Sequence, residues 1–118
     1  MASQNQPIDL VHLARYTGGD RAINEEILRL FEDQCRLNLA KLEALARGSG
    51  DAKSWREIAH TLKGAARGVG AFDLGEAAGA VEKALPTSAQ EELLRLKQEA
   101  EKVADFLAEF LRHEATGT

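Results

Sequence analysis

The chain has 118 residues, of which 44% are hydrophobic and 29% charged, and its formal net charge is −4. This profile is typical of one soluble globular domain, and the mixed charges give no basic footprint for nucleic acid. No apolar stretch approaches the roughly 18 residues that a membrane span needs, and the first residues lack the features of a signal peptide. Cys35 is the only cysteine, so no internal disulfide can form. We therefore expect a cytoplasmic protein with neither nucleic acid nor a membrane as partner.

The first half of the chain predicts a polar arm, a short helix and a long helix. Residues 1–7 are polar and end in a proline, which is typical of a flexible arm. Residues 8–16 form a short helix candidate that a Thr-Gly-Gly sequence stops. Asp20 is placed to cap a second helix that runs to about Arg47, because apolar residues recur there at helical spacing.

This second helix has an unusually wide apolar arc. Two edges flank its core stripe: Leu28, Cys35, Leu39 and Ala46 on one side, and Leu30 and Leu37 on the other. Either one edge stays exposed and takes the apolar helix of a partner, or neighbouring helices cover both edges.

The second half of the chain predicts three more helices. Asp51 is a candidate cap for a helix over residues 52–67, and another helix follows over residues 73–85. Ser88 and Glu91 have the spacing of a capping box, which predicts that the last helix begins there and runs to about residue 114.

Four substantial helices with short connections predict an all-α fold, namely an antiparallel up-and-down four-helix bundle with a short additional N-terminal helix. No segment has the alternating pattern of a strand. The predicted organisation is a flexible arm over residues 1–7, one helical domain over residues 8–114 and a disordered tail over residues 115–118.

The third predicted helix carries a histidine on its polar side. At about 100° per residue, one arc collects the apolar side chains and forms the core face. Its members are Trp55, Ile58, Ala59, Leu62, Ala65, Ala66 and Val69. His60 lies about 150° from the centre of that arc, so we expect it to be exposed to solvent rather than buried.

The neighbours of His60 on the helix surface favour a chemical role. Lys63, Arg56 and Arg67 make a positive patch that could neutralise an anion attached to the imidazole. Gly64 costs a helix interior about 1 kcal/mol relative to alanine, and its missing side chain would let a partner's backbone approach the ring. The alternative is an ordinary solvated helix face, with Gly68 serving only to end the helix.

Residues 59–85, AHTLKGAARGVGAFDLGEAAGAVEKAL, resemble the core motif of histidine phosphotransfer (HPt) domains of bacterial two-component phosphorelays. The residues in register with that motif are His60, Leu62, Lys63, Gly64, Gly70, Ala71, Leu74 and Glu82. The spacing contains no insertion, and the resemblance extends over residues 8–112.

The resemblance implies a phosphocarrier, not an enzyme with its own ATP site. His60 would be the phospho-acceptor, Lys63 would stabilise the phosphoryl group, and Gly64 would keep the approach open. The phosphoryl group would pass between aspartates on the receiver domains of a hybrid histidine kinase and of a response regulator. We expect no bound cofactor or metal, because Mg²⁺ would come with the receiver, and we expect a monomer. Arg56, Arg67 and Gly68 are the candidate docking residues.

One other function is compatible with the same residues, and a further rival has only part of the motif that it needs. The chain could be an interaction module that binds a receiver or kinase without carrying phosphate. A di-iron site would need E-x-x-H motifs on facing helices, and residues 57–60 supply one local match without a second copy.

Overall fold

The computed structural model describes residues 6–48 and 51–116, with side chains as far as Arg112. In these ranges the regular structure is entirely helical, so the predicted all-α class is confirmed. The elements are α1 (Leu10–Thr17), α2 (Arg21–Arg47), α3 (Ala52–Val69), α4 (Phe72–Lys83), the 3₁₀-helix η2 (Pro86–Ser88) and α5 (Gln90–Thr116). The first five residues of the predicted arm and the last two of the predicted tail lie outside the described residues, and α5 includes Ala115 and Thr116.

Aspartate side chains cap the first three helices. The carboxylate of Asp20 accepts a hydrogen bond from the backbone N–H of Ile23, and that of Asp51 accepts one from the N–H of Lys53. Asp9 does the same for α1. A cap of this kind satisfies N–H groups that the first helical turn leaves unpaired, which explains why α2 and α3 begin where the sequence predicts.

The predicted capping box at Ser88 and Glu91 is wrong. Pro86 begins the 3₁₀ turn η2, and within this turn the N–H of Ser88 donates to the carbonyl of Leu85. Ser88 is therefore part of the connection, and α5 begins two residues later, after Ala89. Proline fixes its own φ angle at a value that suits the first residue of a tight helical turn, so the turn forms ahead of the capping pattern.

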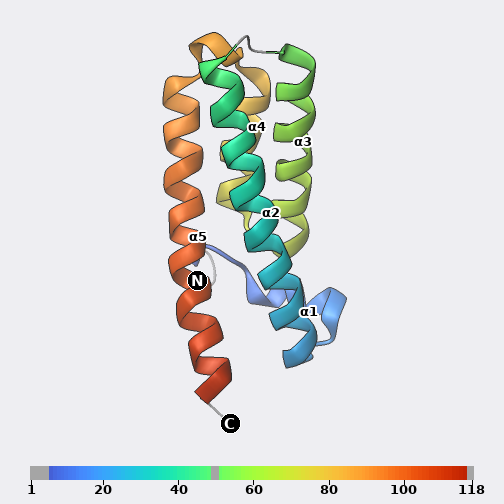
Figure 1. The fold of residues 1–118 in the computed structure, drawn as a ribbon. Helices are drawn as coiled ribbons and strands as arrows, with labels where there is room; N and C mark the ends of the chain where they lie inside the picture. The colour runs from blue at the N-terminus through green and yellow to red at the C-terminus, as the bar shows by residue number, and fades with distance from the viewer. Residues whose placement is uncertain (1–5, 49–50, 117–118) are drawn as a thin grey trace.

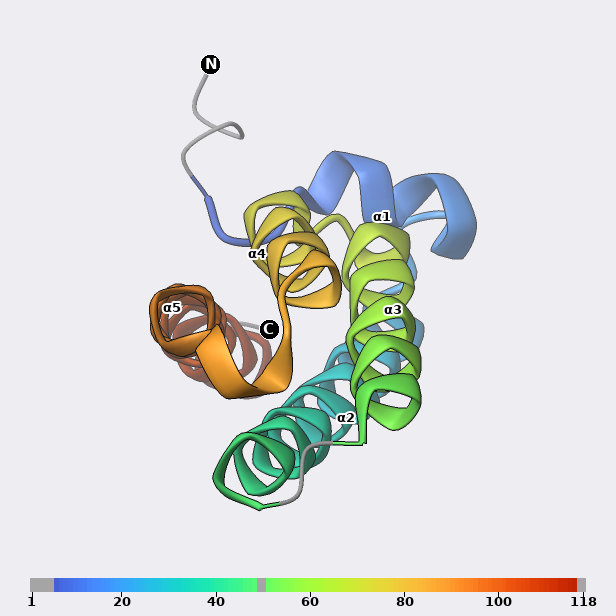
Figure 2. The same cartoon turned by 90° about the horizontal axis from the view of Figure 1, so that it is seen from above.

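The four long helices lie side by side in the order α2, α3, α4 and α5, as Figure 2 shows from above. Each short connection leads into the next helix at the end of the molecule where the previous one finishes (Figure 1). The molecule is elongated, with principal extents of 49 × 25 × 21 Å. The small helix α1 lies at the end of α3 from which α4 begins.

Trp55 joins α3 to the C-terminal end of α4. Its ring is fully buried, and its indole N–H donates to the carbonyls of Val81 at 2.8 Å and Ala84 at 3.0 Å. The carbonyl of Val81 also accepts from the N–H of Ala84, so the indole is its second donor, and the indole in addition pairs the carbonyl of Ala84 just past the end of the helix. The α3–α4 pair that carries the site is held at one end by this contact.

Gly70 makes the close contact between α1 and α3 possible. It ends α3 with a φ of 87°, and its carbonyl accepts a hydrogen bond from the N–H of Asp9 at 2.9 Å. A Cβ atom at this position would lie 2.7 Å from the carbonyl oxygen of Asp9. Both the positive φ and the tight approach require glycine here.

The structure distinguishes the two apolar edges of α2. Leu28 and Cys35 are buried, whereas Leu30 is 60% exposed and Leu37 is 52% exposed. Ile23, seven residues before Leu30, is also exposed, and the three side chains fall on one line along the helix. One edge is therefore covered by the bundle, and the other remains on the surface.

Candidate functional site

His60 projects from α3 into solvent, as its helical position predicts. Its side chain is 68% exposed, while the core-facing residues Trp55, Ala59 and Leu62 on the same helix are fully buried. The predicted core face of α3 is confirmed, and the exposed histidine is a property of the folded chain.

Glu82 of α4 holds the side chains of His60 and Lys63. One carboxylate oxygen, Oε2, lies 3.0 Å from Nδ1 of His60, and the other, Oε1, lies 2.8 Å from Nζ of Lys63. The sequence places Glu82 in register with the family motif but assigns it no role. A separation of 22 residues does not reveal this contact, because it depends on how α4 packs against α3.

The contact with Glu82 determines which ring nitrogen of His60 is available. The pKa of Glu82 is lowered from 4.5, chiefly by the hydrogen bond from Lys63 and then by the one from His60, so the carboxylate is ionised at neutral pH. An ionised carboxylate only accepts hydrogen bonds, so Nδ1 of the neutral ring carries the proton. Nε2 then holds the free lone pair, which makes Nε2 the nucleophilic atom.

The sequence predicts that Lys63 belongs to an open positive patch, but in the structure its side chain is largely covered. Its side chain is only 22% exposed, and its ammonium group is paired with Glu82. Gly79 of α4 lies beneath it, since a Cβ there would be 3.3 Å from Cδ of Lys63. A second glycine of α4, Gly75, makes the same kind of room for the aliphatic part of Arg67. Two glycines one turn apart thus let α4 approach the functional side of α3.

Gly64 and Gly68 leave open surface beside His60. Both are exposed within α3, and a Cβ added to either would have no atom within 4 Å. Neither glycine is required by packing within this chain, and neither ends the helix, which continues to Val69. Packing within this chain therefore does not explain why α3 contains these two glycines, which weaken a helix.

Arg56 and Arg67 are cations on this side of α3 that form no ion pair with a carboxylate of the described residues. Both are exposed, and neither forms an ion pair within residues 6–48 and 51–112. The predicted docking residues thus share one helix and one side with His60 but do not contact its ring.

No group of three His, Cys, Asp or Glu side chains that could hold a metal lies among the described residues. The local E-x-x-H match at residues 57–60 has no partner there. His12 instead makes edge contacts with the rings of Tyr16 and Phe72. The side chain of His113 lies outside the described part.

The family model for the Hpt domain matches residues 26–113, and the chain belongs to this family. The family's involvement in histidine phosphotransfer within two-component phosphorelays is the part of the predicted function that this match confirms. No curated protein and no solved structure matches the chain. No helix in the described part of the chain combines the length and apolar character that crossing a membrane requires.

Proposed function

We propose that this chain is a phosphocarrier in which His60 accepts a phosphoryl group from the aspartate of one receiver domain and passes it to another. The observation that carries this proposal is the exposed imidazole whose Nδ1 is held 3.0 Å from the Glu82 carboxylate. The scaffold would be an antiparallel up-and-down bundle formed by α2 to α5.

The transfer would proceed by in-line attack of Nε2 on the phosphorus of an aspartyl phosphate. The Nε2–P bond forms as the P–O bond to the aspartate breaks, and the aspartate leaves with the electron pair as a carboxylate. The ring keeps its proton on Nδ1 and gains positive charge, which the Glu82 carboxylate stabilises at a distance of 3.0 Å. The reverse sequence returns the phosphoryl group to a second receiver.

Lys63 would neutralise charge on the transferred group. Its ammonium lies 2.8 Å from Glu82, which places it one turn along α3 from the acceptor ring. A flexible side chain with three donor hydrogens can keep one on Glu82 while directing another to a phosphoryl oxygen. The Mg²⁺ ion that spreads charge on the aspartyl phosphate would belong to the receiver domain, and this chain would bring no cofactor and no ATP site.

Docking would use the exposed apolar edge of α2 together with the open surface of α3. Leu30 and Leu37 offer apolar contact, while Gly64 and Gly68 allow close approach of a partner helix. Arg56 and Arg67 would contribute charge at the rim. The partners would be the receiver domains of a hybrid histidine kinase and of a response regulator, and the carrier would be a cytoplasmic monomer.

The experiment is transfer from an isotopically phosphorylated receiver domain to the wild type, to His60→Gln and to His12→Gln as a matched control. We expect label on the wild type and on His12→Gln, stable in alkali and lost in mild acid, with none on His60→Gln. Binding of receivers without any label on the wild type would instead support the interaction module. Label retained by His60→Gln would refute the assignment of the acceptor.

A further inference from the structure

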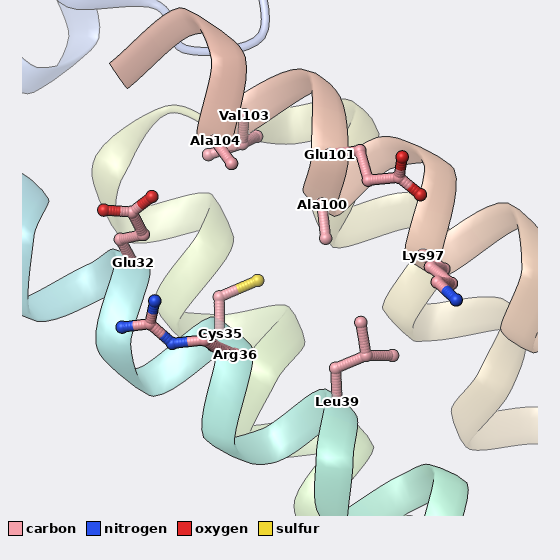
Figure 3. Close-up of a pocket in the computed structure, with 9 residues that line it drawn as sticks. All are labelled: Glu32, Cys35, Arg36, Leu39, Lys97, Ala100, Glu101, Val103 and Ala104. Carbon is pink, nitrogen blue, oxygen red and sulfur yellow. The ribbon is translucent and has the colours of Figure 1, made fainter. Parts of the chain in front are cut away.

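A cleft of about 230 Å³ lies between α2 and α5, partly open to solvent (Figure 3). Its apolar lining comes from Cys35 and Leu39 on α2 and from Ala100, Val103 and Ala104 on α5. In Figure 3 the Cys35 thiol points into the space between the two helices.

The cleft exists because small side chains face each other across the helix pair. Cys35 on α2 meets Ala100 and Ala104, which lie one turn apart on α5. Close packing requires a large side chain opposite a small one, and here neither helix supplies it at this level. The unfilled volume exceeds the roughly 150 Å³ of an engineered apolar cavity that binds benzene.

Charged residues surround the opening without giving it a net charge. Glu32 and Arg36 line it from α2, and Lys97 and Glu101 line it from α5. Two carboxylates and two cations balance, so neither an anion nor a cation would gain from entering. The apolar lining and the balanced rim together select for an uncharged occupant.

The Cys35 thiol is the one polar group that faces the interior of the cleft among its lining residues on the α2 and α5 walls, and it behaves as a small apolar side chain. The residue is 5% exposed, and its thiol has no hydrogen-bond partner among the described residues. Burial and the nearby Glu32 raise the pKa of this thiol to about 11, so it stays protonated and is not a nucleophile at neutral pH. A protonated thiol offers a bound molecule a weak donor and a weak acceptor.

We propose that the cleft between α2 and α5 is a reversible binding site for a small uncharged apolar molecule, of the size of an aromatic ring compound. The ligand would fill the volume between Cys35, Leu39 and Ala104 and would be held by dispersion contacts. The site lies on the α2–α5 seam, whereas His60 meets Glu82 on the α3–α4 seam, so the two sites do not overlap (Figure 2).

The test is a titration of the isotopically labelled protein with indole, followed by two-dimensional NMR. We expect saturable shift changes confined to residues 32–39 and 97–104, and a melting temperature that rises with indole concentration. The variant Ala104→Leu fills the cleft and should abolish both effects. Ala108→Leu is the matched control, because Ala108 is exposed on the same helix and does not line the cleft.

Ala100→Leu provides a second filled variant in case Ala104→Leu does not fold. Non-saturable or dispersed shift changes would overturn the proposal, as would unchanged binding in a folded filled variant. The wild-type titration does not involve His60, so its outcome is independent of whether the protein carries phosphate.

Discussion

At the residue scale, the candidate site depends on a carboxylate that the sequence does not single out, that of Glu82 on α4. Glu82 contacts both His60 and Lys63, and it therefore influences the proton on the ring and the position of the ammonium group. The sequence predicts His60 as the acceptor with Lys63 beside it because both lie on one helix turn. It could not predict the carboxylate's contacts, because these depend on the packing of α4 against α3.

Glu82→Gln should slow transfer from a phosphorylated receiver about tenfold, because a charge-assisted hydrogen bond to the ring becomes a neutral one. We also expect ¹⁵N NMR of the imidazole to show Nδ1–H alone in the wild type and a mixture of tautomers in the variant. A purely structural role would leave the tautomer of the folded variant unchanged, and that result would contradict the positioning role.

The lowered pKa of Glu82 predicts that the free energy of unfolding depends on pH, and the same variant tests this. The folded-state pKa of Glu82 is lowered from 4.5, so its stabilisation is present above that value and is lost as the pH falls through the lowered pKa. Denaturant unfolding of the wild type and of Glu82→Gln should give free energies that differ at pH 7 and converge at lower pH. A difference that stays constant down to pH 3 would exclude Glu82 as its source.

Gly64→Leu should separate access from chemistry. The position has open space around it, so the folded state should keep or gain stability, by up to about 1 kcal/mol from helix propensity. Transfer from a receiver domain should fall at least tenfold, because the new side chain stands where the partner must approach. Phosphorylation by phosphoramidate, a small donor, should be unchanged; equal loss with both donors would mean that the substitution damages the site itself.

At the element scale, the starts of α2 and α3 could be predicted, because an aspartate precedes each run of apolar residues at helical spacing. Asp20 and Asp51 cap α2 and α3 as the sequence predicts. The start of α5 could not be predicted in this way, because a proline-initiated turn displaced the capping pattern at Ser88. The exposure of Leu30 and Leu37 could not be predicted from the sequence either. Periodicity gives the width of an apolar arc on a helix but does not show which neighbouring helices cover it.

The helix α2 contains a polar side chain that the bundle does not satisfy. Asn38 is 7% exposed, and its Nδ2 has no hydrogen-bond partner in the described structure. Asn38→Leu should therefore raise the free energy of unfolding by about 1 kcal/mol, because a buried unpaired donor is removed and apolar area is gained. Chemical denaturation with unchanged m-value measures this; a loss of stability would show that the amide has a partner in solution.

At the scale of the whole molecule, the elongated bundle keeps the candidate site and the cleft on different pairs of helices. The α3–α4 pair presents His60 and the glycines beside it, and α2 adds an exposed apolar edge. The opposite seam, between α2 and α5, contains the cleft. The all-helical class and the exposure of His60 could be predicted from periodicity, whereas the contacts between helices depend on which helices become neighbours.

The most direct measurement is ³¹P NMR of the phosphorylated protein, which distinguishes phosphate on Nε2 of a histidine from phosphate on Nδ1. We predict a single phosphohistidine resonance of the Nε2 type, absent from His60→Gln, because Glu82 occupies Nδ1 in the folded chain. A resonance of the Nδ1 type, or any phosphohistidine signal in His60→Gln, would contradict the account.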